Sequence, residues 1–394
     1  MHFSRLAPFA ALLSALLVAG CSGGRPDGGS LIPIVEEAPG TAEHEILVAT
    51  TRERTPESPE MFTGERVTGI DFARVKVSIP PIHKAGDVEW PRAAPGDPTR
   101  DFVTRERDYI DGEAKFRQRL KAAVATKAPA DRTVLVFVHG YNTAFDEGVY
   151  RVAQIAHDTG FTGVPVLFTW ASRGSLFDYV YDRDSATVAR DALEMTLRIA
   201  SESGANKIVL FAHSMGNWVA VEALRQAKLT GNPDFKGKLT EVVLASPDID
   251  VDVFKAQMER YGKPKEPFFM LISADDRALQ LSQFLAGDKP RLGGYTEDAG
   301  EIASLGVVVV DLSNVTANDG LNHAKFNAVA PDFLQRLRDR LAAGDELDFD
   351  QTTVSEKIGT LGRSLGSAVG TTAGVIITTP ALVITTPVEA IIRR

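Results

Sequence analysis

Ser214 lies in a pattern that is typical of a catalytic nucleophile. The segment Ala212-His213-Ser214-Met215-Gly216 matches G-x-S-x-G, with alanine in place of the first glycine. In a nucleophile elbow, this pattern places the serine on a sharp turn between a strand and a helix, and small neighbours let the two backbones approach. An apolar run, KIVLF, precedes the motif, and a helical pattern, NWVAVEALRQA, follows it. The sequence therefore predicts that Ser214 is a nucleophile.

A serine hydroxyl is a weak nucleophile and needs a base that takes its proton. Of the seven histidines, only His323 lies C-terminal to Ser214, and it follows an apolar run at 305–313. His213 adjoins the serine, but successive residues of a strand point to opposite faces, which makes it a poor base. We therefore expect His323 to be the base.

Four aspartates that follow apolar runs could orient this histidine. Asp275 and Asp276 end the run at 267–276, whereas Asp248 and Asp250 follow the run before it. An aspartate at a strand end often caps the next helix, so at least one of the four is expected to be a cap. The order serine, aspartate, histidine is that of the α/β hydrolases, which favours the first pair and keeps the second in reserve.

A second motif, FVHGYN, contains the end of the apolar run at 133–140. In the α/β-hydrolase fold, the loop after this strand supplies one backbone N–H to the oxyanion hole, and the residue after the nucleophile supplies another. Tyr141 and Met215 would be these donors, each worth about 3 kcal/mol of transition-state stabilisation. We expect His139 to shape the loop rather than to react.

The elements that position these residues alternate along the chain. Strands are predicted at 133–140, 164–172, 206–214, 239–248, 267–276 and 305–313, because continuous apolar runs are typical of strands buried on both faces. Two more are predicted at 45–53 and 73–80, with a polar loop between them, and a last helix begins near Pro331. Strands alternating with helices predict an α/β fold, with a mostly parallel sheet covered by helices on both faces.

The N-terminal residues predict export and lipid attachment. A basic residue precedes an apolar stretch at about 6–18 that is too short to span a bilayer, and LVAGC resembles a bacterial lipobox. We therefore expect a signal peptide over 1–20 and a lipid on Cys21. Because Ser22 follows, the sorting rules that this signal resembles favour the bacterial outer membrane, with the protein facing the periplasm.

The remaining chain divides into three parts. Residues 21–43 are rich in glycine, proline and charge and are expected to be a flexible tether. Residues 44–345 form the predicted hydrolase domain. The tail at 346–394 is rich in glycine and threonine, and it carries no charge over 364–388. That stretch is long enough to cross a bilayer, but its apolar residues are diluted, so a strand or disordered segment against the domain, or a segment on the membrane surface, is the favoured alternative.

Composition restricts the partners. The net charge is −9 and no basic run stands out, which argues against nucleic-acid binding. The histidines show no paired ligand spacing and the chain has one cysteine, so neither a metal site nor a cofactor is expected. The expected partners are a small acyl ester or lipid substrate and, through lipidated Cys21, a membrane.

Several segments together resemble the bacterial α/β hydrolases of uncharacterised function labelled DUF900, which are described as esterase- or lipase-like. The matching segments, between about 45 and 343, are VATTRE, FTGERV, KVSIPPIHKAGDVEWP, VFVHGYNTAFDE, TWASRGSLFDYVYDRDSA, LFAHSMGN, ASPDID and SADDRALQLS. The resemblance implies an acid in the DRAL stretch, which selects Asp276 over Asp275. The family usually has proline after Trp170, where this chain has Ala171. The resemblance to this family implies no particular substrate.

The segment SRGSLFDYVYDRDSA follows a predicted strand, on the side where ligands bind in such folds. Arg173, Tyr179 and Tyr181 could therefore shape a pocket for an acyl chain or headgroup. Asp184 or Ser185 is expected to cap the next helix.

These observations predict a carboxylesterase-like serine hydrolase that cleaves an ester or thioester through an acyl-enzyme on Ser214. No large apolar lid is visible, which favours a carboxylesterase over a true lipase. A phospholipase or acyltransferase is the alternative with the same chemistry, because the anchor would hold the site near lipid. A non-catalytic binding or scaffolding lipoprotein of the envelope is the alternative of another class, since a fold does not imply a function.

Overall fold

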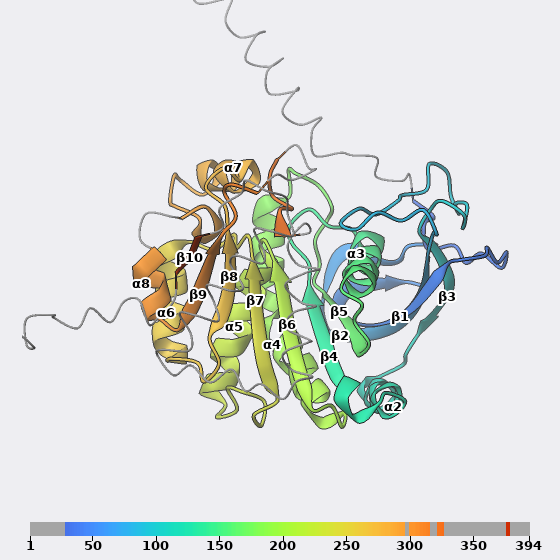
Figure 1. Cartoon of the computed structure of the whole chain (residues 1–394), viewed down its shortest axis with the longest axis horizontal. Coiled ribbons are helices and arrows are strands. Elements are labelled where there is room, and N and C mark those ends of the chain that lie inside the picture. Colours follow the sequence, from blue (N-terminus) through green and yellow to red (C-terminus); the bar gives the residue numbers. More distant parts are fainter. Residues whose placement is uncertain (1–27, 296–298, 316–320, 327–375, 379–394) are drawn as a thin grey trace, which may run out of the picture.

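The computed structural model of the protein describes residues 28–295, 299–315, 321–326 and 376–378, and ten strands of this part form one sheet in the order β10-β9-β8-β7-β6-β4-β5-β1-β2-β3 (Figure 1). The strands are β1 (Ala42–Thr55), β2 (Met61–Ile79), β3 (Val103–Tyr109), β4 (Thr133–Val138), β5 (Val164–Thr169), β6 (Lys207–His213), β7 (Leu239–Ala245), β8 (Phe268–Ile272), β9 (Val307–Asp311) and β10 (Ile376–Thr378). The helices are α2 (Glu113–Ala125), α3 (Phe145–Asp158), α4 (Tyr179–Glu202), α5 (Gly216–Leu229), α6 (Val251–Tyr261), α7 (Arg277–Leu285) and α8 (Ala299–Ser304), with 3₁₀ turns at Pro129–Asp131 and Leu292–Gly294.

The middle of the sheet is parallel and its two edges are not. Strands β1, β5, β4, β6, β7, β8 and β9 run in the same direction. Strands β2 and β3 pair antiparallel at one edge, and β10 pairs antiparallel at the other. The predicted α/β-hydrolase fold, with a mostly parallel sheet, is thereby confirmed.

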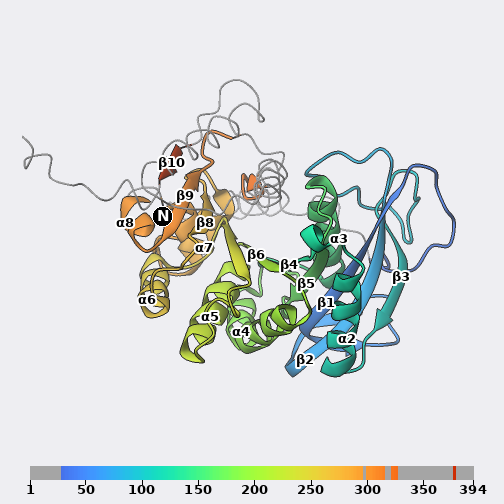
Figure 2. The same ribbon diagram turned by 60° about the horizontal axis from the view of Figure 1, so that its bottom comes forward.

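Helices cover the sheet on both faces. On β4, Val134, Val136 and Val138 point into the core under α2, α4, α5 and α6, whereas Leu135 and Phe137 point into the core under α3. Figure 2 shows α4, α5 and α6 side by side along one face. Because strands β4 to β9 are buried on both faces, their sequences are mostly apolar rather than alternating.

The chain changes its direction of travel across the sheet between β4 and β6. From β4 the chain passes through α3 to β5 on one side and returns through α4 to β6 on the other side of β4. Val138 and Ala212 are paired, so the ends of β4 and β6 are adjacent. Ligands of open α/β sheets bind at such a switch point, beyond the carboxyl ends of the strands.

The first three strands differ most from expectation. Strand β2 begins at Met61, inside the stretch predicted as a polar loop, and β3 was not predicted. Residues 63–71 of β2 are largely exposed or half-buried, so this half of the strand has no apolar pattern to detect. In β3, four of the seven residues are charged.

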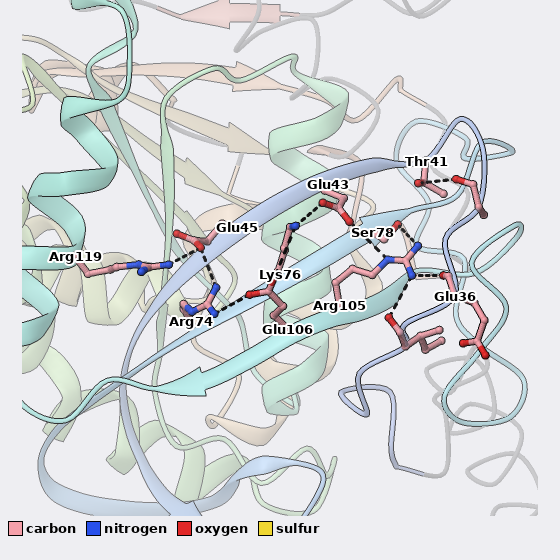
Figure 3. A network of polar contacts seen from close by, with 12 residues as sticks. Glu36, Thr41, Glu43, Glu45, Arg74, Lys76, Ser78, Arg105, Glu106 and Arg119 are labelled. Carbon is pink, nitrogen blue, oxygen red and sulfur yellow. Dashed lines mark hydrogen bonds and ion pairs between the residues drawn. The ribbon is translucent and has the colours of Figure 1, made fainter.

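Ion pairs explain those charges (Figure 3). Arg74 on β2 contacts Glu45 on β1 at 3.1 Å and Glu106 on β3 at 2.7 Å, and Lys76 contacts Glu43 at 2.6 Å. Opposite charges on neighbouring strands stabilise their pairing modestly, and charges on an edge strand disfavour pairing with another chain. The charged residues of β3 therefore suit it to the edge of the sheet. They are also the reason why its sequence shows no apolar pattern.

The residues before β1 are packed on the domain from residue 28, which differs from the flexible tether expected over 21–43. Leu31 and Ile34 are buried. The backbone N–H of Ile34 donates to the Thr104 carbonyl at 2.9 Å, and the Tyr150 hydroxyl donates to the Ser30 carbonyl. The expected signal peptide and Cys21 lie outside the described residues.

The C-terminal expectations fall mostly outside the described residues as well, including the helix near Pro331 and most of the tail at 346–394. Of that tail, Ile376–Thr378 form β10 and pair with Val309–Asp311 of β9. Of the helices that the structure describes, none combines the length and the hydrophobicity needed to cross a bilayer.

Candidate active site

Ser214 sits on a strained turn between β6 and α5. Its φ is +52°, in the left-handed region that a residue with a side chain rarely adopts. The backbone N–H of Ser214 donates to the Ala245 carbonyl at 2.9 Å, and its carbonyl accepts from Asp248 N at 3.2 Å and from Asn217 Nδ2 at 2.8 Å. These bonds on both sides of the serine hold the turn in the geometry of a nucleophile elbow.

Two glycines allow the neighbouring backbones to reach the serine. A β-carbon at Gly216 would lie 2.3 Å from the carbonyl oxygen of His139, and one at Gly140 would lie 2.7 Å from Ser214 Cβ. Ala212, which stands at the first glycine position of the motif, is fully buried. The small residues therefore bring the start of α5 and the loop after β4 against the elbow.

Asp276 and His323 are directly joined. His323 Nδ1 lies 2.8 Å from Asp276 Oδ2, and the aspartate side chain is fully buried. Asp276 Oδ1 accepts from Leu279 N at 3.0 Å, so the same carboxylate also caps α7. With Nδ1–H directed at this carboxylate, Nε2 is the imidazole nitrogen that can accept a proton.

Asp275 holds the histidine loop from the other side. Its Oδ1 accepts from Lys325 Nζ at 2.5 Å, and its Oδ2 accepts from Asn322 Nδ2 at 2.8 Å. Desolvation opposes the shift, but hydrogen bonds from Lys325 and a neighbouring serine hold the pKa of Asp275 below its usual value. Because Asn322 and Lys325 flank His323, this carboxylate positions the loop rather than the imidazole.

Neighbouring residues bring His323 to the elbow. The ring centroid of His323 lies 4.7 Å from that of His213, which precedes Ser214. Ser246 Oγ donates to the His323 carbonyl at 3.2 Å, and Ser246 follows Ala245, whose carbonyl binds Ser214 N. Burial, followed by the charge of His323, lowers the pKa of His213 well below its usual value, so His213 is neutral at pH 7. These contacts place His323, and with it Asp276, near the turn that carries Ser214.

The two reserve aspartates have other partners. Asp250 caps α6 by accepting two backbone N–H groups. Asp248 is buried and accepts from Ser282 Oγ at 2.6 Å and from the Tyr179 hydroxyl at 3.2 Å, and Arg291 Nε lies 3.3 Å from its Oδ1. Desolvation raises the pKa of Asp248. One of the four candidate aspartates is therefore a plain helix cap, as expected, and Asp248 belongs to a buried polar cluster beside the elbow.

The two expected oxyanion donors belong to the segments that adjoin the elbow, since Met215 follows Ser214 and Tyr141 follows Gly140. Met215 is the N-cap of α5, so its N–H is at the N-terminal end of a helix, where negative charge is favoured. Tyr141 is anchored by its hydroxyl, which donates to the Ser175 carbonyl at 3.1 Å, and its ring packs edge-on against Tyr179 at 5.2 Å. Asn142, the next residue, has a φ of +54°.

His139 is buried behind this loop. Its Nδ1 donates to the Gly140 carbonyl at 2.8 Å, its Nε2 accepts from Thr169 Oγ1 at 2.8 Å, and its ring stacks on Trp170 at 5.1 Å. Burial, followed by the charge of Arg52, lowers the pKa of His139 to about 3. His139 is therefore neutral, and its hydrogen bonds at both ring nitrogens stabilise the loop.

Two charged residues near this loop were not singled out from the sequence. Arg52 on β1 and Asp182 on α4 are buried, with exposed fractions of 1% and 0%. Burial lowers the pKa of Arg52 to about 10, and burial raises the pKa of Asp182. A buried charge is costly unless it is paired, but a single sequence does not show which charges are buried. The only available signal was their place in the segments VATTRE and SRGSLFDYVYDRDSA.

The segment after β5 differs from expectation. Tyr179 and Tyr181 lie in the first turn of α4 rather than in a loop, and the Arg173 guanidinium stacks 3.7 Å above the ring of Tyr181. The prediction that Asp184 or Ser185 caps this helix is wrong, because both lie inside it. The segment SRGSLFDYVYDRDSA mixes turn-forming, polar and apolar residues, so its sequence does not show at which residue the helix begins.

Ser214 follows β6, Asp276 follows β8 and His323 follows β9. A hydroxyl, an imidazole and a buried carboxylate are the groups used in acyl transfer. Within the described ranges, no group of three or more histidine, cysteine, aspartate or glutamate side chains is placed to hold a metal ion.

Comparison with known proteins identifies a family. The model of the family described as "Alpha/beta hydrolase of unknown function (DUF900)" matches residues 113–340. This range contains Tyr141, Ser214, Asp276 and His323 and the strands β4 to β9. The match supports a hydrolase as the class of protein. No curated protein matches the chain.

Solved structures of esterases are similar to the chain at low identity. A mutant of the esterase rPPE is 13% identical, with 85% of this chain and 89% of that chain covered and a TM-score of 0.37. A fungal esterase from Rhizomucor miehei is 12% identical, with 78% and 86% covered and a TM-score of 0.36. A hyperthermophilic esterase from the archaeon Pyrobaculum calidifontis is 12% identical, with 87% and 99% covered and a TM-score of 0.34.

Proposed function

Since the chain belongs to the DUF900 family of α/β hydrolases, we propose that it is a serine hydrolase that cleaves an ester or thioester through an acyl-enzyme on Ser214. The observation that carries this proposal is the 2.8 Å contact between Asp276 and His323, beside a serine held at a φ of +52°. A weak hydroxyl needs an oriented imidazole as its base in order to react.

In the first half of the reaction, His323 Nε2 takes the proton of Ser214 Oγ as the oxygen attacks the substrate carbonyl carbon. The N–H groups of Tyr141 and Met215 stabilise the oxyanion of the tetrahedral intermediate. Asp276 stabilises the imidazolium and keeps its orientation. The intermediate then collapses, and the leaving alcohol or thiol departs with the proton from His323.

In the second half, His323 takes a proton from water, and the resulting hydroxide attacks the acyl carbon. The bond to Ser214 Oγ breaks, the serine regains its proton and a carboxylic acid leaves. An alcohol in place of water would give acyl transfer. A small ester remains the expected substrate class, which makes the protein carboxylesterase-like.

We also propose that Cys21 carries a lipid and tethers the domain to the bacterial envelope. The lipobox-like LVAGC supports this proposal. A lipid on Cys21 would hold the site near the membrane surface. Replacement Cys21→Ala should move the protein from the membrane fraction to the soluble fraction, and a variant that stays bound would refute the lipid tether.

Hydrolysis of p-nitrophenyl butyrate tests the catalytic proposal. Ser214→Ala should lower kcat by at least about a thousandfold, because the nucleophile is lost while binding is kept. Ser201→Ala is the matched control, since it removes another buried hydroxyl that bonds only a carbonyl within α4. A Ser214→Ala variant as active as this control would show that another group is the nucleophile.

A further inference from the structure

The loop after β4 is bound by residues from three other elements. We call residues 139–143 the oxyanion loop, because Tyr141 in it is the proposed donor. The carbonyl of its first residue, His139, accepts from Trp170 Nε1 at 3.0 Å. Its last residue, Thr143, is bound at both backbone groups, as described next.

Arg52 reaches this loop from β1. Its guanidinium donates from Nε to Thr169 Oγ1 at 2.7 Å, from Nη1 to the Ser172 carbonyl at 2.8 Å and from Nη2 to the Thr143 carbonyl at 2.7 Å. The rigid, planar fork of an arginine keeps such acceptors at fixed relative positions. Arg52 therefore joins the end of β5 to the oxyanion loop.

Asp182 reaches the same loop from α4. Its Oδ2 accepts from Asn142 N at 3.3 Å and from Ser172 Oγ at 2.6 Å, and its Oδ1 accepts from Arg173 N at 3.0 Å. Ser172 Oγ in turn accepts from Thr143 N at 3.0 Å. The carboxylate thus holds one N–H of the loop directly and a second through a hydroxyl.

The two charged side chains bind the oxyanion loop through opposite kinds of backbone group. Arg52 binds a carbonyl of the loop, Asp182 binds N–H groups, and both bind Ser172. Each charge also partly offsets the cost of burying the other, because opposite charges favour each other's ionised form. The loop geometry therefore depends on both.

We propose that Arg52 and Asp182 are positioning residues for the oxyanion hole, an inference that rests on the proposed acyl-transfer function. Arg52 lies outside the range 113–340 that the family model matches. Strand β1 thereby contributes to the site of the hydrolase core through Arg52.

A displaced donor affects the transition state more than the bound substrate. The donor must meet the oxyanion, which exists only after Ser214 attacks, so a small shift of the Tyr141 N–H lowers kcat and leaves KM nearly unchanged. A residue with a merely structural role would instead lower the fraction of active protein, without changing kcat per active site.

The experiment compares Arg52→Met with the wild type in the full-length protein. Active sites are counted by complete reaction with a fluorophosphonate, and kcat per site is measured with p-nitrophenyl butyrate. We expect a loss of roughly tenfold to a hundredfold in kcat, with KM little changed. Binding of a trifluoromethyl ketone, whose adduct places an oxyanion in the hole, should weaken by a similar factor. Arg52→Lys should recover only part of the loss.

Arg105→Met is the matched control. Arg105 lies on β3 with a side chain that is 7% exposed, and it also donates to backbone carbonyls, those of Ile34 and Glu36, away from the oxyanion loop (Figure 3). This variant should lose stability but keep the wild-type kcat per active site. An equal loss of kcat in Arg105→Met would overturn the inference, because any buried arginine of strands β1 to β3 would then have the same effect.

Ser172→Ala decides the question if Arg52→Met does not fold. It removes one hydroxyl, keeps both charges and breaks the link between Asp182 and Thr143 N. We expect about a fivefold loss of kcat per active site with KM unchanged, in proportion to one neutral hydrogen bond. Wild-type kcat and ketone affinity in a folded variant would refute the positioning role. A wild type that neither titrates nor hydrolyses esters would instead refute the proposed function.

Discussion

Asp275 and Asp276 have the same side chain and adjacent positions, yet their contacts differ. Asp276 bonds the imidazole of His323, and Asp275 bonds the two residues that flank the imidazole, Asn322 and Lys325. The adjacent carboxylates thus contact different parts of one loop, and substitution at each should have a different effect.

Replacement Asp276→Asn should lower kcat by roughly a thousandfold to ten-thousandfold, because the amide favours the wrong tautomer of His323. Asp275→Asn should cost roughly tenfold or less, because it weakens only the loop. Hydrolysis of p-nitrophenyl butyrate by both variants, at equal folded concentration, measures the difference. The reverse ranking would mean that Asp275 is the acid.

The sequence predicted Ser214 and His323 because each position had few candidates, and the structure places Ser214 on a strained turn and His323 against Asp276. The roles of Tyr141 and Met215 as donors stay predictions. The order of motifs left one histidine after Ser214. Residue types alone did not separate Asp275 from Asp276, since only the direction of a side chain distinguishes them. Arg52 and Asp182 were missed for a related reason: most arginines and aspartates are solvated, and burial depends on elements far apart in the chain.

The packing of α5 against β4 is the closest contact between elements at the site. Because a β-carbon at Gly216 would lie 2.3 Å from the His139 carbonyl oxygen, Gly216→Ala should push α5 away from β4. We expect a loss of about 3 kcal/mol in the free energy of unfolding and a strong loss of activity.

Gly69→Ala on β2 is the control for that prediction, because a β-carbon there has no neighbour within 4 Å. It should change the free energy of unfolding by less than about 0.5 kcal/mol. Urea unfolding of the two variants gives the comparison. Equal stability of both would mean that α5 and β4 are not in close contact.

The contact of β1 with α3 should make stability depend on pH. His44 Nε2 lies 3.3 Å from His157 Nδ1, and burial, followed by the charge of His157, lowers the pKa of His44 to about 4. The unfolded chain, with a pKa near 6.5, then binds a proton between pH 6.5 and 4 that the folded protein does not, so stability falls as pH falls through this range.

His44→Gln should therefore flatten the decline of the free energy of unfolding between pH 6.5 and 4. Denaturant unfolding at several pH values measures the slope for wild type and variant. Parallel curves would contradict a proton-linked role for His44. The other buried histidines remain in both proteins, so the difference between the curves isolates this one.

Among elements, the parallel strands were predictable, whereas at the antiparallel edge only the second half of β2 was predicted, by the strand expected at 73–80. Strands β4 to β9 are apolar on both faces, which is a strong signal in a single sequence. The charges of β3 and of the partners it contacts on β2 form cross-strand ion pairs, and such charges are as common in loops as in edge strands. Strand β2 pairs with β1 and β3 pairs with β2, and the local sequence does not encode this pairing.

At the scale of the whole molecule, the segment before β1 also differs from expectation. This segment, rich in glycine, proline and charge, was expected to be flexible, but Leu31 belongs to the core and Ile34 is buried. The composition of the whole segment is polar, and it does not reveal that two apolar side chains within the segment are buried.

Leu31→Ala should therefore lower the free energy of unfolding by about 2–5 kcal/mol, as expected for a fully buried leucine. Ile32→Ala is the matched control, because Ile32 is adjacent and 38% exposed, and it should cost less than about 1 kcal/mol. Thermal or denaturant unfolding distinguishes them. If both variants are equally stable, residues 28–41 do not contribute to the folded domain.

The position of a covalent adduct shows whether Ser214 is the residue that forms an acyl-enzyme. The wild-type protein is treated with a fluorophosphonate, digested and analysed by mass spectrometry. We expect one phosphonyl group on the peptide that contains Ser214, and none on that peptide in Ser214→Ala. A folded wild type without an adduct, or with the adduct on another residue, would refute the role of Ser214 as the nucleophile.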